Sequence, residues 1–142
     1  MKIKKLNKNA IIPTRGSEHA AGYDLYACID EPVAIAPYQT VKIGTGLSFQ
    51  LPDNIAALIF ARSGLATKHG LRPANCVGLC DPDYRGEYIV ALHNDSDIPY
   101  KINPGDRIAQ VVFVEYNAPK FEVVDELDDS NRGEGGFGST GK

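Results

Sequence analysis

Short runs in which hydrophobic and polar residues alternate recur along the chain. The clearest run covers residues 41–51, where the hydrophobic or β-branched members are Val41, Ile43, Thr45, Leu47, Phe49 and Leu51. A period of two predicts a strand with one buried face. Residues 56–60 form a continuous apolar run, which is more typical of a strand buried on both faces. Residues 87–94 and 107–115 also predict strands.

Turn-forming residues separate these runs at close intervals. The chain contains 14 glycines and 9 prolines, and Asn103-Pro104-Gly105-Asp106 predicts a turn between two strands. No long segment has the helical period of about 3.6 residues, and only residues 65–70 suggest a short helix. Many short strands with regular turns predict an all-β fold, a jelly-roll-like β-barrel or sandwich.

The composition changes after Val124. Residues 125–131 are acidic and polar, and residues 132–141 are rich in glycine. Such a segment cannot form a core of its own. We therefore expect a core over residues 1–124 and a mobile C-terminal arm over residues 125–142.

The end of the arm matches seven positions of the phosphate-binding P-loop pattern, from Gly136 to Lys142. A P-loop needs a preceding strand and a following helix, and both are missing here. The chemistry still suits a nucleotide, because glycine amides and the Ser139 hydroxyl can bind phosphate, and Phe137 can stack on a base. We expect the arm to close over a nucleotide as a lid; a solvated, inert end is the alternative.

Composition and charge narrow the class of protein. A length of 142 residues suits one domain, and 43% hydrophobic with 23% charged residues is typical of a globular protein. A net charge of -3 argues against a non-specific nucleic-acid binder. The four lysines among the first eight residues alternate with apolar residues, which predicts the solvent face of a first strand. No apolar run approaches the ~20 residues that span a bilayer, and no signal-peptide pattern is visible, so we expect a cytoplasmic protein without a membrane partner.

The chain has three cysteines, and this odd number favours free thiols in an intracellular protein. Cys76 and Cys80 are four residues apart, as in half of a zinc site. A structural zinc ion needs two further ligands, and the three histidines are scattered along the chain. We therefore do not expect a structural metal.

Two polar residues stand inside otherwise apolar strands. Asp24 lies within residues 21–27, and a buried carboxylate needs a hydrogen-bond network or a cation. Gln110 lies within residues 105–110, and its amide likewise needs partners.

Two further segments carry candidate chemistry. Residues 61–66 place an arginine, a serine and a glycine after a buried strand, which indicates either a phosphate site or a surface turn. Residues 78–87 predict the tip of a hairpin whose arms are residues 76–77 and 88–89. Its acidic residues are either simply solvated or include one that activates water.

Together these segments resemble the five motifs of the homotrimeric dUTPase family. They are residues 21–27, 61–66, 78–87, 105–110 and 132–141. Each motif is modest alone, but all five in this order, from about residue 11 to the end, are highly specific. Ala61 stands where proline is usual, and Cys80 where isoleucine or valine is usual. Neither replacement removes a needed chemical group, and Cys80 beside Asp81 suggests sensitivity to thiol reagents.

The resemblance implies a jelly roll that assembles as a homotrimer with active sites shared between chains. It implies hydrolysis of dUTP to dUMP and pyrophosphate, which limits uracil incorporation into DNA and supplies dUMP for thymidylate synthesis. Asp81 would be the catalytic base for attack of water on the α-phosphorus. Asp24 would hold waters on the Mg2+ cofactor. The substrate-binding residues that the resemblance implies are Arg62, Ser63, Gly64, Asn75, Gly78, Leu79, Tyr84, Gln110, Arg132, Phe137, Gly138 and Ser139.

Within that set the implied tasks are divided by chemistry. Those assigned to the phosphates are Arg62, Ser63, the Gly64 backbone, Gln110, Arg132 and Ser139. Asn75 and the backbone near Gly78 and Leu79 would read the uracil edge. Phe137 would stack on uracil, and Tyr84 would pack under the deoxyribose. Two alternatives stay open: a dCTP deaminase-like enzyme and a non-catalytic nucleotide- or protein-binding module, both on the same fold.

Overall fold

The computed structural model describes residues 1–136, and its regular elements are strands with one short helix. In chain order they are β1 (Lys2–Lys5), β2 (Tyr23–Tyr26), β3 (Val33–Ile35), β4 (Thr40–Gly44), β5 (Leu47–Gln50), β6 (Ile55–Phe60), α1 (Ser63–His69), β7 (Leu71–Pro73), β8 (Gly78–Cys80), β9 (Ile89–Asn94), β10 (Tyr100–Ile102) and β11 (Arg107–Glu115). Across residues 1–136, no helix is long and apolar enough to cross a membrane.

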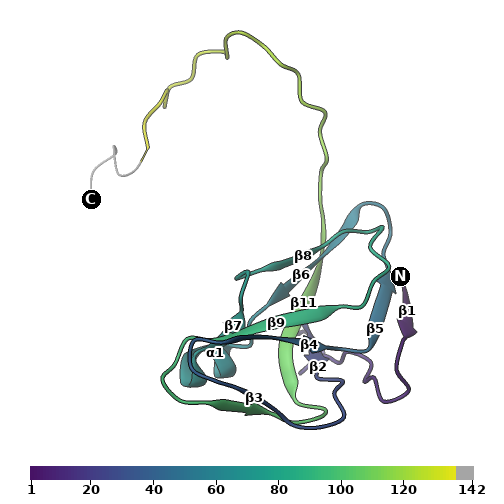
Figure 1. Ribbon diagram of the computed structural model, residues 1–142. Helices are drawn as coiled ribbons and strands as arrows, with labels where there is room; N and C mark the ends of the chain where they lie inside the picture. The colour runs from purple at the N-terminus through teal and green to yellow at the C-terminus, as the bar shows by residue number, and fades with distance from the viewer. Residues whose placement is uncertain (137–142) are drawn as a thin grey trace.

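The strands form small antiparallel sheets that pack into one body (Figure 1). The largest has the order β2-β11-β6-β8, and a three-stranded sheet has the order β4-β9-β7. Two-stranded sheets, β1-β5 and β3-β10, complete the body. The prediction of an all-β, jelly-roll-like fold is confirmed, with these sheets remaining open rather than joining into a closed barrel.

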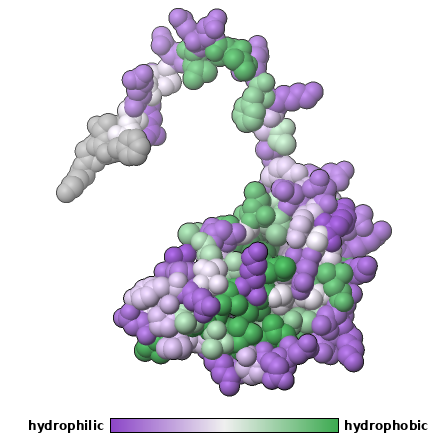
Figure 2. Space-filling view, in the orientation of Figure 1, coloured by the Kyte–Doolittle hydropathy of each residue, from purple (hydrophilic) through white to green (hydrophobic). Residues whose placement is uncertain are grey.

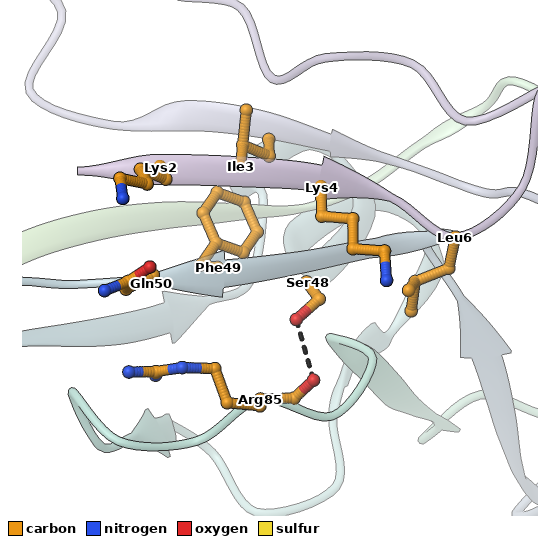
Figure 3. A pocket seen from close by; sticks show the side chains of 8 residues that line it. All are labelled: Lys2, Ile3, Lys4, Leu6, Ser48, Phe49, Gln50 and Arg85. Carbon is orange, nitrogen blue, oxygen red and sulfur yellow. Dashed lines mark hydrogen bonds between the residues drawn. The ribbon is translucent and has the colours of Figure 1, made fainter.

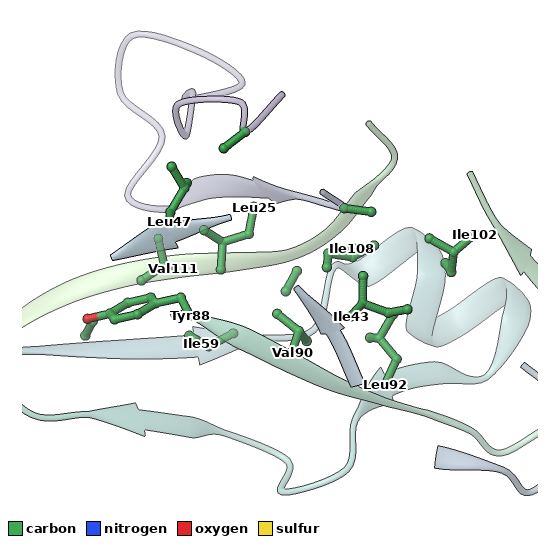
Figure 4. Close-up of a cluster of buried hydrophobic side chains, with 14 of the residues drawn as sticks. Leu25, Ile43, Leu47, Ile59, Tyr88, Val90, Leu92, Ile102, Ile108 and Val111 are labelled. Atoms are coloured by element: carbon green, nitrogen blue, oxygen red, sulfur yellow. The ribbon is translucent and has the colours of Figure 1, made fainter. Parts of the chain in front are cut away.

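The core lies between the four-stranded and three-stranded sheets. Leu25 and Val111 come from the first sheet, and Ile43 and Leu92 come from the second, all at 1% exposure or less (Figure 4). Burying one such side chain contributes about 1.5–3 kcal/mol to folding. The core therefore fixes the four-stranded sheet, whose strands carry the candidate residues Asp24, Gly78, Leu79 and Gln110.

The prediction of one strand over residues 41–51 is wrong, because the chain bends between β4 and β5. Thr45 is buried there, and its hydroxyl donates a hydrogen bond of 2.7 Å to the Tyr88 carbonyl. Gly46 follows with φ of 66°, and an added Cβ would lie 2.8 Å from the Cys28 sulfur. Alternation continues through the bend because side chains on both sides of it face the core, so the pattern alone did not reveal the break.

Other predicted elements are confirmed with small shifts in their bounds. β6, β9 and β11 correspond to the apolar or alternating runs predicted as strands, and α1 to the predicted short helix. The turn before β11 contains Gly105 with φ of 79°, and the Asp106 amide donates to the Asn103 carbonyl at 3.1 Å.

The predicted hairpin around residues 78–87 needs correction, because its two proposed arms do not pair. β8 instead pairs with β6, with Gly78 opposite Ile59. The Tyr88 amide donates to the Leu47 carbonyl at 2.8 Å, so the chain after the loop joins β5. The loop thus connects two different sheets.

A groove of about 400 Å³ lies between β1 and the loop that follows β8 (Figure 3). All four residues of β1 are exposed, which confirms a solvent-facing first strand. Lys2, Lys4 and Arg85 give the groove a positive charge. The Ser48 hydroxyl donates to the Arg85 carbonyl at 2.7 Å, so β5 holds this loop in place.

Beyond β11 the chain leaves the body as an extended arm (Figure 1). Tyr116 fixes its root: its hydroxyl donates to the Asp53 carbonyl at 3.0 Å, and its amide to the Asn54 carbonyl at 3.1 Å. Residues 117–134 are exposed, and apolar side chains such as Phe121 stand out in solvent along the arm (Figure 2). The boundary between core and arm at residue 124 stays a prediction.

Candidate functional site

The loop after β8 forms the first of two candidate pockets. This pocket is called the base pocket after the role that the sequence resemblance implies for its residues, and it has a volume of about 240 Å³. Its lining includes five predicted site residues: Asn75, Gly78, Leu79, Asp81 and Tyr84. The glycine is required for close packing, because a Cβ at position 78 would lie only 3.1 Å from the Ile59 Cβ.

Main-chain hydrogen bonds shape the loop that carries Asp81. The Tyr84 amide donates to the Asp81 carbonyl at 3.2 Å, and the Tyr84 hydroxyl donates to the Glu87 carbonyl at 3.1 Å. A Cβ on Gly86 would overlap the Tyr84 phenol, so only glycine lets that ring lie across the loop. The exposed Asp81 carboxylate is therefore presented by a loop whose conformation is internally fixed.

Cys80 and Tyr88 line the base pocket beneath this loop. The Tyr88 ring is buried and stacks on Phe49, with ring centroids 4.4 Å apart. Burial raises the pKa of the Cys80 thiol, with the nearby Asp81 charge adding to the effect. Burial likewise raises the pKa of the Tyr88 phenol. Both groups are therefore neutral at physiological pH.

A second pocket lies where β2, β11 and the end of β6 meet, and it is called the phosphate cleft after the role that the sequence resemblance implies for its residues. It has a volume of about 470 Å³, and its lining includes Asp24, Arg62, Ser63, Gly64 and Gln110. Strand register brings these residues together, because Gln110 stands opposite Asp24 on one side and opposite Phe60 on the other. Arg62 follows two residues after Phe60, at the start of α1.

Two guanidinium groups hold the Asp24 carboxylate. Arg62 Nε donates to one oxygen at 2.9 Å, and Arg107 Nη1 donates to the other at 3.2 Å. The Asp24 side chain is only 13% exposed, so these ion pairs are the partners that its position in an apolar strand requires. The Gln110 amide donates to the Ala61 carbonyl at 2.9 Å.

The start of α1 adds donors to the phosphate cleft. Arg62 precedes the helix in an extended conformation, so Ser63 and Gly64 belong to its first turn. Amides of a first turn have no acceptor within their own helix and can bind an anion. No atom lies within 4 Å of the position that a Gly64 Cβ would occupy, which leaves this backbone open to a ligand.

The base pocket and the phosphate cleft lie on opposite faces of the four-stranded sheet. Ile59 lines the former and Phe60 the latter, and successive side chains of a strand point to opposite faces. No residue lines both pockets. The residues of one described chain therefore do not form a single continuous cavity.

A model of the dUTPase family matches residues 8–141. The chain belongs to the dUTPase family. Its five motifs all fall within the matched range, and the match covers nearly the whole chain. Membership agrees with the resemblance seen in the sequence.

Relatives and solved structures agree with this assignment. The deoxyuridine 5'-triphosphate nucleotidohydrolase of Desulfitobacterium hafniense is 50% identical over 92% of this chain and 87% of the relative. That of Coxiella burnetii is 46% identical over 98% of this chain and 92% of the relative. The Staphylococcus bacteriophage 80alpha dUTPase with dUpNHpp superposes with a TM-score of 0.90 at 31% identity, covering 99% of this chain and 98% of the phage chain.

A dUTPase from Staphylococcus phage phi11, described with a structural Mg(II) ion, has a TM-score of 0.80 at 26% identity. It covers 89% of this chain and 97% of the phage chain. These likenesses favour a dUTPase over a deaminase-like enzyme or a non-catalytic module on the same fold.

Three of the predicted dUTPase site residues, Phe137, Gly138 and Ser139, lie outside the described residues. Arg132 lies on the exposed arm, where its Nε donates to the Gly135 carbonyl at 2.7 Å, and it lines neither pocket. Conversely, Arg107 lines the phosphate cleft but was not predicted, although it stands inside the fourth motif. An arginine at the start of a strand usually faces solvent, so the sequence carried no distinctive signal for it.

Proposed function

We propose that this dUTPase hydrolyses dUTP to dUMP and pyrophosphate by attack of water on the α-phosphorus. One observation supports the proposal most strongly. Apart from Arg132, every described residue of the predicted site lines either the base pocket or the phosphate cleft. One pocket combines backbone and aromatic groups with a carboxylate, and the other is charged.

In the proposed reaction Asp81 orients the attacking water and accepts its proton. The new bond forms between the water oxygen and the α-phosphorus, and the bond to the bridging oxygen of the β-phosphate breaks. Pyrophosphate leaves with that oxygen. The Asp81 carboxylate suits this role because it is exposed at the pocket rim and its loop is fixed by hydrogen bonds.

The base pocket accounts for selection of uracil and deoxyribose. The pairing edge of uracil presents an acceptor, a donor and an acceptor, which backbone groups at Gly78 and Leu79 and the Asn75 amide can complement. Cytosine reverses two of these and would leave buried groups unpaired, which is an effective basis of discrimination. Tyr84 would pack under the sugar and leave no space for a 2'-hydroxyl.

In the phosphate cleft, Arg62, Ser63, the Gly64 backbone and Gln110 would bind the triphosphate. Among residues 1–136, no three His, Cys, Asp or Glu side chains are grouped to hold a metal ion directly. Asp24 alone suits a Mg2+ ion that keeps its water shell and takes oxygens from the substrate. The ion would neutralise phosphate charge, while Asp24 would hold its waters.

We further propose a homotrimer in which different chains supply the two halves of each site. A single nucleotide must contact both pockets, yet these lie on opposite faces of one sheet. A base pocket of one copy facing the phosphate cleft of another resolves this conflict. Arg132, Phe137, Gly138 and Ser139 would then reach the nucleotide with the arm and close the site.

The proposed reaction is tested by measuring pyrophosphate release from dUTP, dCTP, dTTP and UTP in the presence of Mg2+. Release from dUTP alone, reduced about 100-fold or more by Asp81→Asn, is expected for loss of a general base. Asp83→Asn, two residues away on the same loop, is the matched control and should retain activity. Tight dUTP binding without release by the wild type would show a binding module instead.

A further inference from the structure

An extra residue in β11 determines which side chains face the phosphate cleft. Gln110 pairs with Asp24, and Ala109 pairs with Leu25, but the next partner of β2, Tyr26, pairs with Arg107. Ile108 is therefore inserted between two residues that oppose neighbours on β2. Such a β-bulge changes the direction in which a strand presents its side chains.

The bulge brings Arg107 to the same face of the sheet as Gln110. Positions three apart on a regular strand face opposite sides, so an unbulged β11 would turn Arg107 towards the core. In the structure, Ile108 and Ala109 are instead both buried, at 1% and 0% exposure. The two consecutive core residues return Arg107 to the cleft.

Arg107 contacts both charged residues of the cleft. Its Nη1 donates to Asp24 Oδ2 at 3.2 Å, and its carbonyl accepts from Arg62 Nη1 at a long 3.5 Å. The Arg107 side chain is half exposed, whereas Asp24 is nearly buried. Arg107 thus links the mouth of the cleft to the carboxylate within it.

We propose, on the basis of the proposed dUTP hydrolysis, that Arg107 is a positioning residue for the triphosphate and acts through Asp24. With one carboxylate oxygen held by Arg107, Asp24 keeps its orientation when Arg62 turns towards phosphate. The second guanidinium also offsets the carboxylate charge, which would otherwise repel the triphosphate. Without Arg107, the Asp24 carboxylate can rotate, and its negative charge is less compensated beside the triphosphate.

The proposal is tested by binding of dUpNHpp and of dUMP to Arg107→Gln, measured calorimetrically both with Mg2+ and with EDTA. We expect dUpNHpp affinity to fall about tenfold in both media, as for loss of a charge-assisted contact, and dUMP affinity to stay within about twofold. KM for dUTP should rise while kcat changes little, because the contact is the same in ground and transition states. Arg107→Lys should restore part of the loss.

A double-substitution cycle separates action through Asp24 from a direct or general charge effect. In an Asp24→Asn background, Arg107→Gln should weaken dUpNHpp binding by less than about twofold. Equal effects in both backgrounds would overturn the proposed route through Asp24. Lys42→Gln on the exposed face of β4 removes the same charge and is the control for net charge.

Unchanged dUpNHpp affinity in Arg107→Gln, or an equal loss for Lys42→Gln, would overturn the role of Arg107. An equal loss of dUMP affinity would show damage to the fold, also overturning it. A wild-type protein that binds dUpNHpp but releases no pyrophosphate from dUTP would instead refute the proposed reaction. The analogue titrations distinguish the two failures because they require no turnover.

Discussion

The base pocket and the phosphate cleft are built by different forces. Around Asp81, main-chain hydrogen bonds and two required glycines, Gly78 and Gly86, set the shape. Around Asp24, the shape depends on ion pairs from this carboxylate to two long side chains, Arg62 before α1 and Arg107 on β11. Under the proposed function, a pocket built by backbone would keep a fixed shape for the base, whereas ion-paired side chains could exchange partners when the charged triphosphate binds.

The largest expected effect comes from mixing chains that are defective in opposite pockets. Asp81→Asn and Arg62→Gln chains should each be nearly inactive. Co-refolded in equal amounts, they should recover about a quarter of wild-type pyrophosphate release, because a site shared between two chains receives both intact residues in about one case in four.

No recovery in demonstrably mixed oligomers would show that each chain completes its own site. Mixing Asp81→Asn with Asn75→Ala, two defects of the same pocket, is the control and should recover nothing. Comparison of the two mixtures separates complementation between the two pockets from stabilisation of a defective chain by mixing.

A smaller effect is expected from adding one methyl group to either pocket. Gly78→Ala should lower the free energy of unfolding by about 1–3 kcal/mol, because the new Cβ would crowd Ile59 in a packed sheet. Gly64→Ala should change it little, since the position is open. Urea unfolding of both variants measures the contrast, and equal losses would contradict the view that backbone packing fixes only the base pocket.

Salt should distinguish the two pockets in ligand binding. Raising ionic strength from about 0.1 M to 1 M shortens the screening length from about 10 Å to 3 Å, which weakens half-exposed charge contacts. We expect dUpNHpp affinity to fall about fivefold, with deoxyuridine affinity nearly constant. Calorimetry with a salt series gives both values. A parallel decline for the two ligands would show that charge also governs the base pocket.

The smallest effect concerns thiol chemistry in the base pocket. Because burial raises the pKa of the Cys80 thiol, less of the reactive thiolate is present near neutral pH, and its fraction grows only as pH rises. Iodoacetamide should therefore modify the exposed Cys76 before Cys80, and the lag of Cys80 should shorten at higher pH. Peptide mass spectrometry over time measures both rates. Activity unchanged after full Cys80 alkylation would remove the expected sensitivity to thiol reagents.

The sequence grouped residues that line the two pockets better than it predicted how the chain arranges them. Asp24 and Gln110 were identifiable because polar residues in apolar strands need partners, and they face each other across β2 and β11. The continuous apolar run over residues 56–60 also located β6, and residues 107–115 located β11. These signals are local in the chain.

What the sequence did not predict depends on contacts between distant segments. The break at Gly46 is set by packing against Cys28 and Ala10. The loop around Asp81 does not close a hairpin: it connects β8, which pairs with β6, to Tyr88, whose amide hydrogen-bonds to β5. Only pairing between distant strands determines this. Arg107 was missed because its face depends on the register of β11 against β2.

The anchor at Tyr116 makes the arm a tether of known reach. From that residue to Gly136 there are 20 steps of the chain, which span at most about 70 Å when fully extended. If the proposed closure occurs, the last motif of the arm, confined to such a radius, would meet a nearby nucleotide at an effective concentration of order mM, whatever the concentration of protein in solution. Closure of the arm would therefore be independent of dilution, and cutting the chain just after Tyr116 would convert it into a bimolecular event that micromolar protein cannot sustain.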